Sequence, residues 1–174
     1  SMECFNGQWY VFYHRSTHGT VFSRHVCAEP ICFNEDGSIS EVMQTTSGVG
    51  DPLPASTPLE AHRACEMSGH VRIAGDENSL HNLALSEIRN GDTATFRYLA
   101  FDGETNFTIR MKNHAPCRVE LYLDGRYLAD LKVAAAEAYT TAEATVPAVT
   151  GTHTLTLKFF GDFTAASVDE FSFS

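Results

Sequence analysis

Apolar and polar residues alternate along much of this chain, which is the period-two pattern of strands that bury one face and expose the other. The alternation is clearest over residues 107–112, 119–124 and 155–159. Helical periodicity is hard to find, and the Ala-rich stretch 134–138 lies between strand patterns, where we expect a loop or a single turn. The pattern therefore predicts an all-β fold of antiparallel sheets, each wet on one face and dry on the other.

The first 46 residues predict a four-stranded antiparallel segment. Asn6-Gly7 is a strong signal for a two-residue hairpin turn, and residues 34–37 (Asn-Glu-Asp-Gly) are a second turn signal. His18-Gly19 is expected in the loop between the second and third strands. Four antiparallel strands of this length are one propeller blade's worth of chain. The expected strands are residues 2–5, 9–14, 25–33 and 39–43.

Two units are expected, joined by a linker. Residues 47–58 hold two Gly and three Pro, and because Pro lacks a ladder donor and Gly loosens the backbone, this stretch is expected to connect the units. Residues 59–174 carry further alternating strands, separated by turn signals such as Asn90-Gly91-Asp92 and Asp124-Gly125. Two such sheets packed face to face predict a β-sandwich. The expected division is a blade-like segment 1–46, a linker 47–58 and a sandwich 59–174.

Charge and composition exclude several classes of protein. Of the 174 residues, 43% are hydrophobic, which is enough to bury a core, and the formal net charge is −10. This acidic field repels phosphates, so we expect no nucleic-acid partner. No apolar run approaches the roughly 20 residues that span a bilayer, so no membrane segment is expected. Five Cys without a C-x-x-C pair predict neither a zinc site nor a redox motif, and free thiols favour a reducing compartment.

Two stretches resemble known families. The run from Asn6 to Arg15 (NGQWYVFYHR) and the later Glu29-Pro30-Ile31 resemble the last blade of glycoside hydrolase family 43, which folds as a five-bladed β-propeller. Residues 59–174 resemble a carbohydrate-binding module of family 6, a jelly-roll β-sandwich, through pieces such as Val168-Asp169-Glu170-Phe171. The two resemblances imply that the chain is the C-terminal part of a longer plant-polysaccharide hydrolase, separated from its other blades.

The resemblance to the hydrolase implies that the catalytic carboxylates lie on earlier blades, so we expect the chain to be inactive alone. In the first segment Glu35 and Asp36 fall in an exposed turn, and Glu29 is expected to pack or to accept hydrogen bonds. His14 corresponds to a histidine that faces the propeller axis in the resembling enzymes and helps hold a metal ion or its waters. One imidazole cannot hold a metal tightly, so His14 is expected as a vestigial polar residue at a strand end.

The resemblance to the binding module implies a sugar cleft at one loop end of the sandwich, built from two aromatics and an Asn. One aromatic corresponds to Tyr139, the other falls near Ser86, which has no ring, and the Asn position falls on Ser167. Two interpretations stay open: Tyr139 stacks on xylan or arabinan chains, or it packs on the rim of a purely structural module that has lost its cleft. A third interpretation is an enzyme in its own right, but the sequence offers no set of catalytic residues for it. Further candidate sugar platforms are Tyr98, Tyr122 and Tyr127.

The same module family often carries a structural calcium ion, held by acidic residues of its first and last strands. Glu60 and Asp169 match two of those positions, whereas His62 replaces a further Glu. Calcium takes six to eight oxygen ligands. The sequence therefore leaves two possibilities open: a calcium ion at Glu60 and Asp169, or direct contact of Asp169 with His62 or a backbone group.

The first segment carries aromatic residues that are costly to leave in water, among them Trp9, Tyr10 and Phe12. We expect this segment to pack against the sandwich, to contact the rest of the parent propeller, or to form a homodimer of the fragment. The family resemblance favours secretion and the free thiols favour the cytoplasm, so the compartment stays open.

Overall fold

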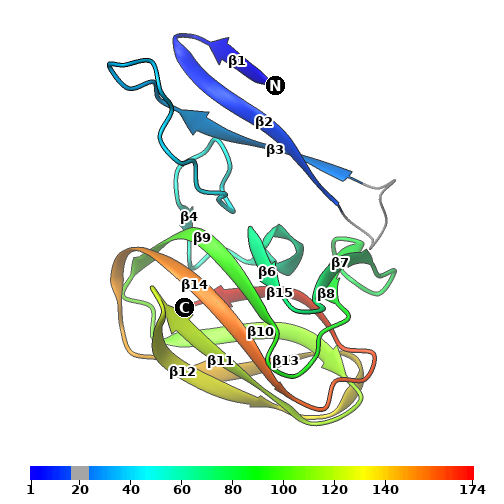
Figure 1. Ribbon diagram of the computed structural model, residues 1–174. Helices are drawn as coiled ribbons and strands as arrows, with labels where there is room; N and C mark the ends of the chain where they lie inside the picture. The colour runs from blue at the N-terminus through cyan, green and yellow to red at the C-terminus, as the bar shows by residue number, and fades with distance from the viewer. Residues whose placement is uncertain (17–23) are drawn as a thin grey trace.

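The computed structural model describes residues 1–16 and 24–174, so the expected loop at His18-Gly19 lies outside the described residues. Figure 1 shows two parts, a small N-terminal sheet and a larger β-sandwich. The described chain has a single helical element, the short 3₁₀ turn η1 (Ala61–Arg63), and it contains no helix long and apolar enough to cross a membrane. The prediction of an all-β fold with a sandwich is confirmed.

The N-terminal sheet has three antiparallel strands in the order β1 (Met2–Phe5), β2 (Gln8–Ser16) and β3 (Arg24–Ile31). Asn6 and Gly7 turn the first hairpin, both with positive φ (50° and 83°), as the two-residue turn requires. The expected fourth strand is reduced to one bridge, between Phe33 and Ile39. A longer strand does not form here because the chain then crosses to the sandwich, where Thr46 forms hydrogen bonds with the backbone of Arg97.

The sandwich consists of two six-stranded sheets that enclose the hydrophobic core. One sheet has the order β13 (Ala136–Thr145), β10 (Asn106–Asn113), β15 (Ser167–Phe173), β8 (Leu83–Ser86) and β7 (Arg72–Gly75), with β5 (Leu59–Glu60) beside β15. The other has the order β12 (Arg126–Val133), β11 (Cys117–Leu123), β14 (Thr150–Gly161), β9 (Thr93–Asp102) and β4 (Leu53–Pro54), with β6 (Glu66–Ser68) beside β9. Aromatic rings join the two layers: the centroids of Phe96 and Phe171 lie 4.6 Å apart.

The stretch expected as a linker lies against the sandwich. Within it, β4 pairs in parallel with β9, which places Leu53 opposite Leu99. The buried Ala55 donates its N–H to the carbonyl of Ala100 at 2.8 Å, and its carbonyl accepts from the N–H of Phe173 at 2.9 Å. Because Ala100 and Phe173 belong to different sheets, these bonds fasten this stretch to both layers.

A buried carboxylate ties the N-terminal sheet to the chain that crosses to the sandwich. Glu29 on β3 is 2% exposed and accepts hydrogen bonds from the Tyr13 hydroxyl (3.2 Å), the Thr45 N–H (2.7 Å) and the Thr45 hydroxyl (2.9 Å). Burial and the negative charge of Glu29 raise the pKa of Tyr13, so its hydroxyl stays a donor. The expectation that Glu29 serves as a hydrogen-bond acceptor is confirmed.

The residue after Thr45 reaches the sandwich itself. Thr46 donates its N–H to the carbonyl of Arg97 on β9, and the N–H of Arg97 donates to the Thr46 hydroxyl at 3.0 Å. Two arginines reinforce the junction: Arg15 Nη1 donates to the Ala64 carbonyl at 2.5 Å and Arg63 Nη2 to the Thr46 carbonyl at 3.2 Å. The N-terminal sheet thus packs against the sandwich, as one of the sequence expectations had it.

Removing the carboxylate should loosen this junction. Glu29→Ala leaves the Thr45 N–H and the Tyr13 hydroxyl without their acceptor, so we expect the free energy of unfolding to fall by about 2 kcal/mol. Limited proteolysis should then cut the N-terminal sheet sooner than the sandwich. The control is Glu41→Ala, which alters an exposed carboxylate. Equal denaturation midpoints and equal cleavage rates for both variants would show that Glu29 does not hold the junction.

Candidate functional site

A polar pocket of about 480 Å³ opens at one end of the sandwich, near the end of β8 and the start of β15. A volume of this size falls in the range of small-ligand sites. Its walls come from the β8–β9 connection, from β10 and from the loop before β15. The lining includes Ser86, Glu87, Arg89, Lys112, Phe163 and Ser167.

The structure brings the three residues of the expected sugar cleft together beside this pocket. Ser86 and Ser167 lie opposite each other on β8 and β15, with their hydroxyls 3.3 Å apart. The hydroxyl of Tyr139, on β13, is hydrogen-bonded to Ser167 Oγ at 2.8 Å and donates to Asp76 Oδ2 at 2.9 Å. Sequence reasoning missed Asp76, which follows β7 and also lines the pocket.

An ion pair fixes Asp76 at the pocket wall. Lys112 Nζ lies 2.7 Å from its Oδ2. Burial alone would raise the pKa of Asp76, but hydrogen bonds from Lys112, the Asn78 backbone and Tyr139 outweigh it and lower the pKa to about 2. Burial, together with the neighbouring Asp76 carboxylate, raises the pKa of Tyr139. At neutral pH this wall therefore holds a carboxylate, an ammonium and a protonated phenol in fixed contact.

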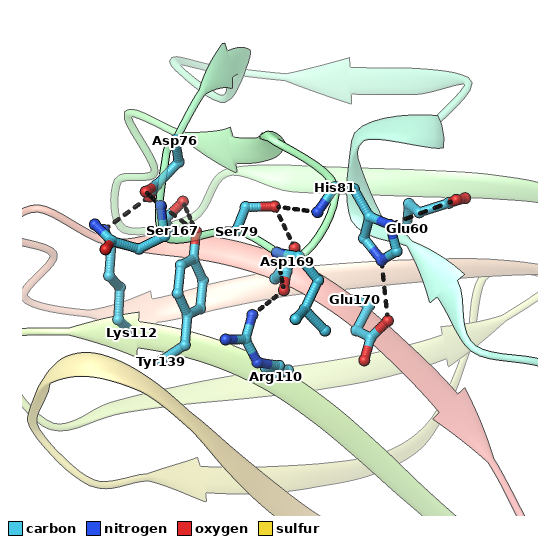
Figure 2. Close-up of polar contacts among 12 residues, drawn as sticks. Glu60, Asp76, Ser79, His81, Arg110, Lys112, Tyr139, Ser167, Asp169 and Glu170 are labelled. Atoms are coloured by element: carbon cyan, nitrogen blue, oxygen red, sulfur yellow. Dashed lines mark hydrogen bonds and ion pairs between the residues drawn. The ribbon is translucent and has the colours of Figure 1, made fainter.

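Cations flank the ring of Tyr139. Arg110 Cζ lies 4.4 Å and Lys112 Nζ lies 5.0 Å from the ring centroid, and Figure 2 shows the ring standing between the two side chains. Such cation–π contacts hold an aromatic ring in place. Tyr139, the residue expected as a sugar platform, thus contacts Arg110 and Lys112 through its ring. Its hydroxyl forms hydrogen bonds with Asp76 and Ser167.

Asp169, on β15, is fully buried and has three donors of its own. Its carboxylate forms an ion pair with Arg110 and accepts from the Ser79 hydroxyl at 2.5 Å (Figure 2). It also accepts from the Leu80 N–H at 3.2 Å. Of the alternatives left open by the sequence, a backbone contact is present, through Leu80. Arg110 and Ser79 were not foreseen.

The residues at the expected calcium positions do not fit a calcium ion. Both Asp169 oxygens already face donors, one of them the positive guanidinium of Arg110. Glu60 Oε2 lies 3.5 Å from Arg63 Nη1, and Glu60 Oε1 lies 3.9 Å from His81 Nδ1. The Nδ1 atom of His62 is buried and has no hydrogen-bond partner among the described residues. In the described part of the chain, no group of three or more His, Cys, Asp or Glu is placed to hold a metal. Calcium, which needs six to eight oxygens, lacks a ligand set at these positions.

His14 lies on β2 opposite Val26, where its side chain is exposed.

Two contributors to the pocket, Phe163 and Glu87, also escaped the sequence analysis. Phe163 had a signal, since it is an aromatic residue directly after Gly161-Asp162 and close to the last strand. Glu87 had none, because only the fold reveals that its backbone is left-handed, with φ at 57°.

Arg110 should act as the built-in counter-ion of Asp169. Arg110→Leu leaves a fully buried carboxylate unpaired, so we expect the free energy of unfolding to fall by about 3 kcal/mol, with partial recovery in the Arg110→Leu/Asp169→Asn double variant. The control is Arg118→Leu, because Arg118 pairs with Glu120 at 2.9 Å but is 45% exposed, and such pairs contribute less than about 1 kcal/mol. Chelator should leave the wild-type melting temperature unchanged. A drop of several degrees with chelator, or equal losses for both arginines, would contradict this assignment.

Comparison with known proteins places the chain in a family. The family model of the carbohydrate binding module (family 6) matches residues 60–174. Among curated proteins, a xylosidase/arabinosidase from Thermoclostridium stercorarium is 31% identical over 185 residues, covering 92% of this chain and 39% of that protein. The chain therefore spans well under half of that relative's length.

Solved structures share the fold. A family 43 arabinoxylan arabinofuranohydrolase from Bacillus subtilis, in complex with cellotetraose, superposes with a TM-score of 0.71 at 23% identity, over 99% of this chain and 40% of that one. The module CsCBM6-3 from Clostridium stercorarium, in complex with cellobiose, gives 0.65 at 24% identity over 72% of this chain and 98% of that one. A module of another family, CBM36 in complex with calcium and xylotriose, gives 0.53 at 20% identity over 68% and 99%. By the match to residues 60–174, this chain belongs to carbohydrate binding module family 6.

Proposed function

We propose that the chain is the noncatalytic C-terminal region of a plant-polysaccharide hydrolase, and that its sandwich binds xylan- or arabinan-type chains in the pocket beside Tyr139. The observation that carries the proposal is the gathering of Ser86, Ser167 and Tyr139 around one polar pocket at the end of the sandwich. The similarity to a xylosidase/arabinosidase supports the class of polysaccharide. The complexes of similar structures with cellobiose and cellotetraose support a binding role for oligosaccharides.

The catalytic step of the longer protein is proposed to lie outside this chain. Glycoside hydrolysis usually needs two carboxyl groups free to flank the scissile bond. Glu29 is buried and engaged by Tyr13 and Thr45, and Asp36 is engaged by Ser38. These contacts support the expectation that the chain alone releases no sugar.

The N-terminal sheet is proposed to contact the preceding part of the longer protein. Its exposed apolar side chains are large, and leaving them in water costs free energy. The relatives extend well beyond the length of this chain, which supports the rest of the parent propeller as the occupant, with a homodimer of the fragment as the alternative. The exposed apolar side chains of this part are Met2, Phe5, Trp9, Val26, Phe33, Ile39 and Met43.

A second candidate function is purely structural, with the sandwich stabilising the propeller and no sugar bound. The observation in its favour is the state of Tyr139, whose ring contacts Arg110 and Lys112 and whose hydroxyl contacts Asp76 and Ser167. The docked junction at Thr46 and Arg97 would serve this role as well.

Affinity electrophoresis on gels containing arabinoxylan or arabinan separates the two functions. We expect the wild-type chain to be retarded and Tyr139→Ala to be retarded less, because the substitution releases Asp76 and Ser167 from the pocket wall. Tyr10→Ala, which removes a tyrosine from β2 of the N-terminal sheet, is the control and should migrate like the wild type. A wild-type chain that migrates equally with and without polysaccharide would leave only the structural function.

A further inference from the structure

We infer that this pocket holds a neutral sugar chain through Phe163, Glu87 and Arg89, and that Tyr139 supports the pocket from behind rather than stacking on the sugar. The inference rests on the proposed function and specifies the contact residues and the class of glycan. Nothing in the family match or the similar structures assigns a role to these three side chains.

The first support is that the groups of Tyr139 are already used. Its hydroxyl has two partners, and Arg110 and Lys112 lie at its ring. A pyranose or furanose that stacked on this ring would have to displace Arg110, which is the counter-ion of the buried Asp169. Displacing Arg110 would leave a buried charge unpaired, which costs far more than one stacking contact returns.

The second support is that Phe163 supplies an alternative ring. It lies in the loop between β14 and β15, lines the pocket and is half-buried. Its ring packs edge-to-face with the core residue Phe159, with centroids 6.1 Å apart and an interplanar angle of 86°. A ring held in this way presents a preformed apolar surface to the C–H face of a sugar without ordering a mobile side chain.

The third support is a pair of unused polar groups on the connection after β8. Glu87 and Arg89 are both exposed and both line the pocket, and within the described residues neither the carboxylate nor the guanidinium has a hydrogen-bond or ion-pair partner. A carboxylate accepts from sugar hydroxyls and a guanidinium donates to them, so together they can read neighbouring hydroxyl groups.

The connection that carries these groups is held rigidly. The buried Asp92 accepts from the Arg89 N–H at 3.0 Å and from the His70 N–H at 3.0 Å. Glu87 itself has a left-handed backbone, with φ at 57°, and Ala165, which also lines the pocket, has φ at 51°. Non-glycine residues with a left-handed backbone are strained, and such strained residues concentrate where a structure positions groups for a ligand.

Charge in the pocket points to a neutral glycan. The lining holds two carboxylates, Asp76 and Glu87, and two cations, Lys112 and Arg89, so it carries no net formal charge. The chain as a whole carries −10. An acidic polysaccharide would meet this overall field and two carboxylates inside the site, whereas a neutral chain meets only hydrogen-bonding groups and one ring.

Isothermal titration with a soluble neutral arabinoxylan tests the contact residues. We expect Phe163→Leu, which keeps the apolar volume on Phe159 but removes the ring, and Glu87→Gln, which removes the charged acceptor, each to weaken binding about 10-fold. The matched controls are Phe160→Leu, a half-buried ring on the outer face of β14, and Glu143→Gln, an exposed carboxylate on β13. Both controls should bind within 2-fold of the wild type, and thermal melts should show all four variants folded.

The outcomes separate this inference from the proposed function. If the wild type binds neither arabinoxylan nor arabinan, the proposed function fails and this inference fails with it. If the wild type binds but Phe163→Leu and Glu87→Gln bind equally well, the proposed function stands and the contact residues named here are wrong. A loss of binding confined to Phe160→Leu would show that the sugar binds on the outer face of β14 and would overturn this inference. Tighter binding of polygalacturonate than of arabinoxylan would overturn the assignment of a neutral glycan.

Discussion

The buried carboxylate of Asp169 sets the arrangement at the end of the sandwich where the polar pocket opens. A charge without solvent contact needs a cation or donors, and here Arg110, Ser79 and the Leu80 N–H surround it. Arg110 serves twice, because its guanidinium also lies over the ring of Tyr139. Tyr139 in turn connects to Ser167 and Asp76, so the wall of the pocket is built outward from one ion pair (Figure 2).

A second buried carboxylate plays the same part at the junction of the N-terminal sheet and the sandwich. Glu29 gathers Tyr13 and Thr45, and the next residue, Thr46, pairs with Arg97 in the sandwich. Each carboxylate joins segments that lie far apart in sequence, and each is satisfied entirely by protein groups. The two parts of the chain are thereby packed together, while large apolar side chains of the N-terminal sheet stay exposed.

Strand alternation was enough to predict the all-β fold, because Phe107, Ile109 and Met111 do face the core. The resemblance to a binding module also brought Ser86, Ser167 and Tyr139 to one place. What it missed depends on contacts between distant residues. Arg110 looks like any polar residue of an alternating strand, and only the register of β10 and β15 sets it beside Asp169. The prediction of a fourth strand was wrong for the same reason. The contacts of Thr45 with Glu29 and of Thr46 with Arg97 join residues that lie far apart in sequence, and a strand pattern does not reveal such contacts.

The central claim is that sugar binds at the end of the sandwich, in the pocket built on the Asp169–Arg110 pair. Titration of the isotope-labelled chain with a neutral xylo- or arabino-oligosaccharide, followed by backbone amide chemical shifts, locates the ligand directly. The account predicts saturable shifts at residues 86–89 and 163–167. Shifts confined to the outer face of β11, β12 and β14, or none at millimolar ligand, would contradict it.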